Sequence, residues 1–145
     1  MRIKEKELQK MFDKAGITKA QLHEALKTMG KKHLKTKLMK DAWTMDNPTK
    51  NYCYVVSEFV YYYLSPPGSK PYKLAGIPGD DGLHRFIKWP DDTIVDLSVD
   101  QFDNYEDVDY SQAKVCYFMT NQYNKGPSKR ARILDKAIDD KTPLE

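Results

Sequence analysis

The stretch HRFIKWPDDTIVDL, residues 84–97, decides the fold of this chain. Two runs rich in β-branched and aromatic residues, 84–89 and 93–97, flank the turn-forming triplet Pro90-Asp91-Asp92. We therefore predict that the two runs are strands of an antiparallel β-hairpin.

The length of the hairpin loop decides which side chains share a face. If residues 90–92 form a three-residue loop, Trp89 lies opposite Thr93, and His84 and Asp96 become diagonal neighbours on one face. A two-residue loop would place these two side chains on opposite faces.

Other elements follow from periodicity and turn signals. Apolar spacing predicts two N-terminal helices joined through Gly16-Ile17 and a buried central helix over 52–64 that begins near Thr49 or Asn51. Further predicted elements are a short segment at 72–74, a Gly/Asp turn at 79–82, a strand over 114–119 and a last helix from about Ser128. The order predicts an α+β fold in which a helical hairpin precedes a central helix packed on a small antiparallel sheet.

Length and composition exclude several classes of protein. The 145 residues suit one domain, and 40% hydrophobic with 31% charged residues allows a real core. No apolar run is long enough to span a bilayer, and the first residues lack the apolar region of a signal peptide. Two cysteines are too few for a disulfide scaffold. We expect a cytoplasmic protein that does not bind membranes.

Charge is unevenly distributed along the chain. Residues 1–40 hold twelve Lys/Arg against four Asp/Glu, a balance of +8, whereas residues 41–145 carry −5. We therefore divide the chain into a basic N-terminal helical arm, 1–40, and an α+β domain, 41–145, within one globular unit. The arm could bind nucleic acid, which is the less favoured reading, or lie on its own acidic body.

Three residues could form a catalytic triad. Asp96 interrupts an apolar run, which is costly unless the carboxylate is paired, and the predicted hairpin offers His84 as its partner. Cys53, in the first turn of the central helix, would be favoured as a thiolate by the helix dipole. His84 would then take the thiol proton while Asp96 orients the ring. Each residue also has an ordinary structural reading: a small buried hydrophobe, a capped strand residue and a turn-facing carboxylate.

Supporting residues are less clearly marked. The Cys53 backbone N–H, with the side chain of Asn47 or Asn51, could stabilise an oxyanion, and Gln101 could serve the site or cap a strand end. Because no close pair of ligands is present, we expect no metal site.

The basic start of the last helix opposes the helix dipole, since it reads KRAR over residues 129–132. It calls for an anionic neighbour. The acidic 100–109 segment is the simplest candidate for this neighbour, and a nucleic-acid phosphate is the alternative with a functional meaning.

Five segments carry a family resemblance. They read NYCYVVSE at 51–58, GLHRF at 82–86, DDTIVDLSVDQF at 91–102, VCYFMT at 115–120 and PSKRA at 127–131. This series resembles a group of phage and bacterial proteins related to the YunG-like family, whose patterns run G-K-C-Y-x-A-S-E, H-W, D-G-T-x-x-D-x-T-x-D-Q-F, G-C-G-F-L-T and P-S-x-R-A. The resemblance covers residues 43–138. It departs at Tyr52 and Arg85, which flank the proposed nucleophile and base.

The resemblance implies a papain-like or transglutaminase-like core with Cys53, His84 and Asp96 as its triad. We therefore expect a phage-encoded cysteine hydrolase or acyl-transfer enzyme that acts on a peptide or small amide without a cofactor, in the cytoplasm of the host. The alternative is a papain-like binding module without turnover, which engages a host or defence protein, or nucleic acid through the arm.

Overall fold

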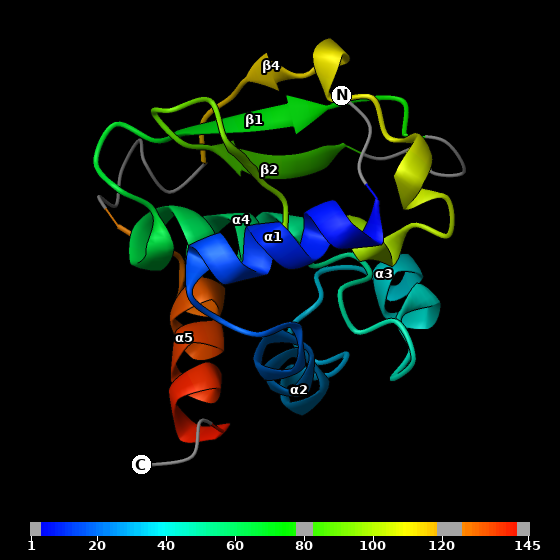
Figure 1. Cartoon of the computed structure of the whole chain (residues 1–145). Coiled ribbons are helices and arrows are strands. Elements are labelled where there is room, and N and C mark those ends of the chain that lie inside the picture. The colour runs from blue at the N-terminus through cyan, green and yellow to red at the C-terminus, as the bar shows by residue number, and fades with distance from the viewer. Residues whose placement is uncertain (1–3, 78–82, 119–125, 142–145) are drawn as a thin grey trace.

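The computed structural model describes residues 4–77, 83–118 and 126–141 and has an α+β fold (Figure 1). Its helices and strands are α1 (Glu5–Ala15), α2 (Lys19–Met29), α3 (Lys37–Ala42), α4 (Cys53–Phe59), β1 (Lys70–Leu74), β2 (His84–Lys88), β3 (Ile94–Val95), β4 (Lys114–Val115) and α5 (Lys129–Lys141). A π-helical turn, Val60–Leu64, continues α4, and three short 3₁₀ turns lie at Val99–Gln101, Tyr105–Asp107 and Tyr110–Gln112.

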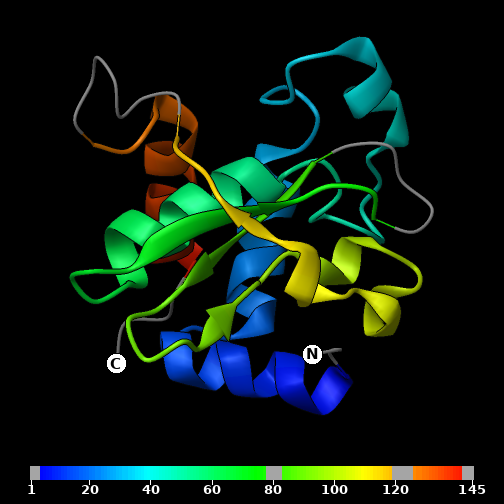
Figure 2. The ribbon, with the colours of Figure 1, turned by 90° about the horizontal axis from the view of Figure 1, so that it is seen from above.

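The sheet is antiparallel, with strand order β3-β2-β1-β4. Helix α4 packs against β2, and α5 packs against both α4 and α2. Figure 2, which looks down on the sheet, shows α4 running beneath the strands. The first residue of the central helix therefore lies close to the central strands, where the site is built.

The predicted register of the hairpin is confirmed. Ile87 pairs with Val95, and the Trp89 N–H donates to the Thr93 carbonyl at 2.9 Å, so residues 90–92 form a three-residue loop. Asp92 adopts the left-handed conformation, φ 68°, that closes this loop. The pairing fixes which side chains of the two strands face the core.

The two N-terminal helices end at glycines in the positive-φ region, as the sequence predicted. The N-terminus of α2 carries the predicted capping box between Thr18 and Gln21. Each helix packs mainly on the body, α1 against β3 and α2 against α5. Their buried apolar residues join those of the sheet and α4 in a common core.

Some basic residues of the arm contact carboxylates of the body. Lys14 pairs with Asp91 at 2.7 Å, and His23 pairs with Asp100 at 2.9 Å. These contacts put part of the basic arm against its own acidic body, which is one of the two readings that the charge distribution left open.

The central helix begins later than predicted. Asn51 has φ 65° and Tyr52 has φ −105° and ψ 8°, so neither Thr49 nor Asn51 starts a helix, and α4 begins at Cys53. The left-handed turn at Asn51, a residue type that tolerates it, separates the preceding loop from the helix. Cys53 is therefore the first residue of the helix and lies in its first turn, as predicted.

The last strand is shorter than predicted. Only Lys114–Val115 is extended in a ladder, and Cys116 continues the contact with one bond from its N–H to the Pro71 carbonyl at 3.0 Å. Cys116 is buried, as expected. Met119 and the predicted 79–82 turn lie outside the described residues.

The anionic neighbour at the start of α5 is Glu58 from α4, where the sequence predicted the acidic 100–109 segment. The Glu58 carboxylate is fully buried and accepts hydrogen bonds from the Ser128 N–H at 3.0 Å and the Ser128 hydroxyl at 2.6 Å. An acidic group at a helix N-terminus is favourable, so Glu58 couples the central helix to α5. Over the described residues, no helix is long and apolar enough to cross a membrane.

Candidate active site

Cys53 lies at the N-terminus of α4, directly after the turn at Asn51 and Tyr52. The Tyr52 ring before it is fully buried, and its hydroxyl donates to the Gly30 carbonyl at 2.6 Å. This places the aromatic ring in the core, while Cys53 itself is partly exposed. The departure from the family pattern at Tyr52 therefore does not cover the thiol.

His84 and Asp96 meet as the hairpin register predicts. His84 Nε2 lies 2.6 Å from Asp96 Oδ2, and both side chains are almost wholly buried. The Tyr110 hydroxyl donates to the same Asp96 oxygen at 2.8 Å. The Phe102 ring packs edge-on against the imidazole, with 5.0 Å between ring centroids. These contacts fix the ring and its carboxylate in one orientation.

The thiol of Cys53 lies beside the start of β2. Its sulfur is 3.6 Å from the Leu83 carbonyl, and the Arg85 N–H also interacts with it. His84 lies between these two residues in the strand. Asp96 occupies Nε2, and the buried Nδ1 has no hydrogen-bond partner among the described residues, so Nδ1 is the ring nitrogen left available to the thiol. The interaction of the ring with Cys53 is seen in the lowered pKa of the thiol.

Electrostatics favours an ionised pair. Burial raises the pKa of the Cys53 thiol, but its interaction with the His84 ring, the charge on that ring and the Arg85 N–H outweigh burial and lower the pKa below its ordinary value. Burial lowers the pKa of His84, but the Asp96 carboxylate and the Cys53 thiol raise it to about 10. The arrangement therefore favours thiolate and imidazolium together, with Asp96 balancing the charge on the ring.

The other cysteine has the opposite environment. Burial raises the pKa of the Cys116 thiol, and the charges of Arg85 and Lys73 offset this only in part. Cys116 is therefore a built-in control for the reactivity of Cys53.

The three candidate oxyanion residues have different positions. Gln101 and Asn51 line the pocket beside Cys53, and Gln101 Oε1 accepts the Asn51 backbone N–H at 3.2 Å. Gln101 Nε2 donates to the Ser98 carbonyl at 3.1 Å, and Asn51 Nδ2 donates to the Met39 carbonyl at 3.2 Å. Gln101 thus supports the turn that presents Cys53 and also faces the pocket.

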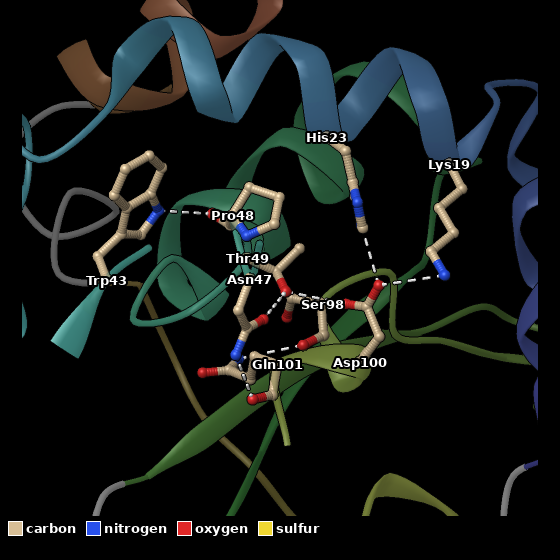
Figure 3. Close-up of polar contacts among 9 residues, drawn as sticks. All are labelled: Lys19, His23, Trp43, Asn47, Pro48, Thr49, Ser98, Asp100 and Gln101. Atoms are coloured by element: carbon tan, nitrogen blue, oxygen red, sulfur yellow. Dashed lines mark hydrogen bonds and ion pairs between the residues drawn. The ribbon is translucent and has the colours of Figure 1, made fainter. Parts of the chain in front are cut away.

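Asn47 is a supporting residue. Its Nδ2 donates to the Gln101 carbonyl at 2.9 Å (Figure 3). Asn47 is not among the described residues that line the pocket. The same network includes Thr49, whose hydroxyl donates to Asp100 Oδ1 at 2.9 Å, while His23 from α2 contacts Asp100 Oδ2 at 2.9 Å. The arm is therefore linked through Asp100 to the loop that leads into Cys53.

A pocket of about 330 Å³ opens beside Cys53. It is lined by Lys35, Met39, Asn51, Cys53, Tyr54, Leu83, Arg85, Gln101, Phe102 and Arg130. Arg85 lies on its wall with the guanidinium 5.0 Å from the centre of the Tyr54 ring. A carbonyl compound that enters this pocket would reach the thiol between apolar and cationic walls.

Sequence reasoning missed Tyr110, Lys35 and the pocket role of Arg130. Tyr110 belongs to a short 3₁₀ turn in an irregular acidic stretch, where no periodicity marks a buried hydroxyl. In the sequence, Arg130 stands out only as part of the basic start of the last helix. Across the described ranges, no cluster of His, Cys, Asp and Glu side chains has the grouping of a metal site.

Comparisons of the chain with protein-family models, with curated proteins and with solved structures find no match. The case for a function therefore rests on the geometry of the site itself.

Proposed function

We propose that this protein is a cysteine hydrolase or acyl-transfer enzyme that acts on an amide or ester carbonyl. The observation that carries the proposal is the buried pair of His84 and Asp96 beside the thiol of Cys53. The papain-like arrangement that the family resemblance implies uses the same three residue types, which lends support.

The reaction would proceed in two balanced steps. The Cys53 thiolate attacks the carbonyl carbon and forms a C–S bond, and the C–N or C–O bond breaks as the His84 imidazolium gives its proton to the leaving group. Water, or an acceptor amine in acyl transfer, then attacks the thioester while His84 takes its proton. The thiolate leaves, and the acid or new amide is released.

Asp96 and two donors complete the proposed machinery. Asp96 stabilises the imidazolium and holds Nε2, which leaves Nδ1 free to exchange a proton with the thiol. The Cys53 N–H lies at the start of a helix, and Gln101 Nε2 carries a second hydrogen beyond the one given to Ser98. These groups are the candidates to stabilise the oxyanion. Hydrolysis by this route needs no cofactor, and we expect it to occur in the cytoplasm of a bacterial host of a phage.

The test compares alkylation rates at the two cysteines. We would measure iodoacetamide labelling of Cys53 and Cys116 against pH, by peptide mass spectrometry, in the wild type and in His84→Ala and His84→Gln. Cys53 should react fast below its ordinary pKa of ~8.5 and slow by roughly tenfold or more at neutral pH in both variants. Lys136→Gln, a change at an exposed position of α5, should leave the rate unchanged.

A second readout separates an enzyme from a binding module. Incubation with p-nitrophenyl acetate should acetylate Cys53 transiently and release nitrophenol over many turnovers, and Cys53→Ser should abolish both. Labelling of Cys53 that is as slow as that of Cys116, or independent of His84, would exclude the enzyme and favour the binding module.

A further inference from the structure

The pocket beside Cys53 has an unusual balance of charge. Lys35, Arg85 and Arg130 line it, and of the described lining residues none carries a carboxylate. The three cations come from separate parts of the chain, namely the end of the basic arm, strand β2 and the first turn of α5. The fold therefore brings together cations that are far apart in the sequence.

Contacts other than ion pairs hold the two arginines in place. Arg130 Nη1 donates to the His33 carbonyl at 3.2 Å, and the Arg85 guanidinium stacks over Tyr54. Within the described residues, neither arginine forms an ion pair with a carboxylate. A guanidinium held in this way keeps further N–H groups for bidentate binding of a carboxylate.

A neighbouring titratable group reflects the same positive potential. Burial lowers the pKa of His33, and the charges of Lys32, Arg130 and Lys129 lower it further. Walls of low polarity around a cluster of like charges concentrate the field on the space between them. Here the apolar part of the wall is formed by Met39, Leu83 and Phe102.

We propose that this pocket selects acyl substrates that carry a carboxylate close to the scissile carbonyl. This inference rests on the proposed function, because the carboxylate would be bound by Arg85 and Arg130 while the carbonyl meets Cys53. At about 330 Å³ the pocket is at the small end of ligand sites, so it suits a short acidic peptide segment or a small amide of a dicarboxylic acid.

The test uses two alkylating agents of similar size but different charge. Iodoacetamide is neutral, whereas iodoacetate carries a carboxylate next to the carbon that the thiolate attacks. We would measure both rate constants at Cys53 and divide their ratio, acetate over amide, by the ratio for the same cysteine in the urea-unfolded chain. The folded protein should favour iodoacetate by about threefold or more, and added salt should reduce this preference.

Variants assign the preference to the pocket. Arg85→Gln and Arg130→Gln should each bring the normalised ratio closer to one. Lys35→Gln should do so as well, and because Lys35 is exposed its replacement leaves the packing intact. Lys136→Gln, an equal change of charge at an exposed position further along α5, should leave the ratio unchanged.

The two ways to fail are distinct. If iodoacetamide itself labels Cys53 as slowly as Cys116, the proposed function falls. If iodoacetamide reacts fast but the normalised ratio is one or lower, or is equally affected by Lys136→Gln, the carboxylate preference is overturned while the proposed enzyme stands.

Discussion

His84 Nε2 and Asp96 Oδ2 lie 2.6 Å apart inside the core, joined across a hairpin whose three-residue loop sets their register. A charged pair in such a place is stable only when both partners are present, because each desolvated charge needs the other. Substitutions at this pair should therefore lower the free energy of unfolding more than the same substitutions at the protein surface.

Replacement of Asp96 should separate charge from hydrogen bonding. Asp96→Ala leaves His84 and the Tyr110 hydroxyl without their acceptor and should lower the free energy of unfolding by about 3–5 kcal/mol. Asp96→Asn keeps an acceptor oxygen but loses the charge, so it should unfold less easily than Asp96→Ala. Urea unfolding of both variants and the wild type measures the two contributions. Equal losses in the two variants would show that the hydrogen bonds add nothing beyond the charge, and no loss in Asp96→Asn would show that the charge is irrelevant.

The pH dependence of stability follows from His84. Its pKa, which burial lowers but Asp96 and Cys53 raise, is about 10 in the folded chain and ~6.5 in the unfolded chain. A basic group with a raised pKa contributes its full stability below pH ~6.5 and loses this contribution as the pH rises through 10. We predict that the free energy of unfolding falls across this window.

The measurement is best made in Cys53→Ser. The lowered pKa of the Cys53 thiol makes the free energy of unfolding rise with pH, which opposes the fall due to His84, and the serine removes this contribution. Urea unfolding from pH 6 to 10 should show a smaller fall in Cys53→Ser/Asp96→Asn, because the carboxylate that raises the pKa of His84 is gone. A parallel fall in the two proteins would refute the assignment of the slope to this pair.

Tyr110 should stabilise the pair as a positioning residue. Tyr110→Phe removes one donor to a charged acceptor and should cost about 1.5–3 kcal/mol of unfolding free energy. It should also change the pH profile of Cys53 alkylation, which a purely structural role would not do. Tyr105→Phe removes a hydroxyl from the same irregular stretch and should change little, so a similar loss in both variants would exclude a specific role.

Asp100 should couple the arm to the site loop. Asp100→Asn weakens the contacts with Thr49 and His23 that tie α2 to the residues before Cys53 (Figure 3). We expect a lower unfolding free energy and faster amide hydrogen exchange in residues 47–52. Asp103→Asn removes the same charge at an exposed neighbouring position and should have neither effect. Unchanged exchange in Asp100→Asn would show that the arm does not support the loop.

The features that the sequence predicts correctly are those that depend on residues close together in the chain. The triplet at residues 90–92 set the register of His84 and Asp96, and glycines marked the ends of the first two helices. Alternation and turn chemistry act over a few residues, so these features could be derived without the fold.

Features that depend on distant partners could not be derived. The start of α4 depends on Gln101 accepting the Asn51 N–H from fifty residues away, and the Tyr110 contact with Asp96 lies in a stretch without periodicity. The Glu58 cap on α5 joins residues seventy positions apart, so the nearer acidic segment was the wrong choice. The convergence of Lys35, Arg85 and Arg130 likewise exists only in three dimensions.

The most direct test of the central claim is the ionisation of Cys53. Its thiolate can be titrated by ultraviolet absorbance in Cys116→Ser, with Cys53→Ser/Cys116→Ser subtracted as the blank. We predict an apparent pKa below the ordinary value of ~8.5 that rises in His84→Gln. A thiol that titrates at or above the ordinary value, unchanged by His84→Gln, would contradict the account.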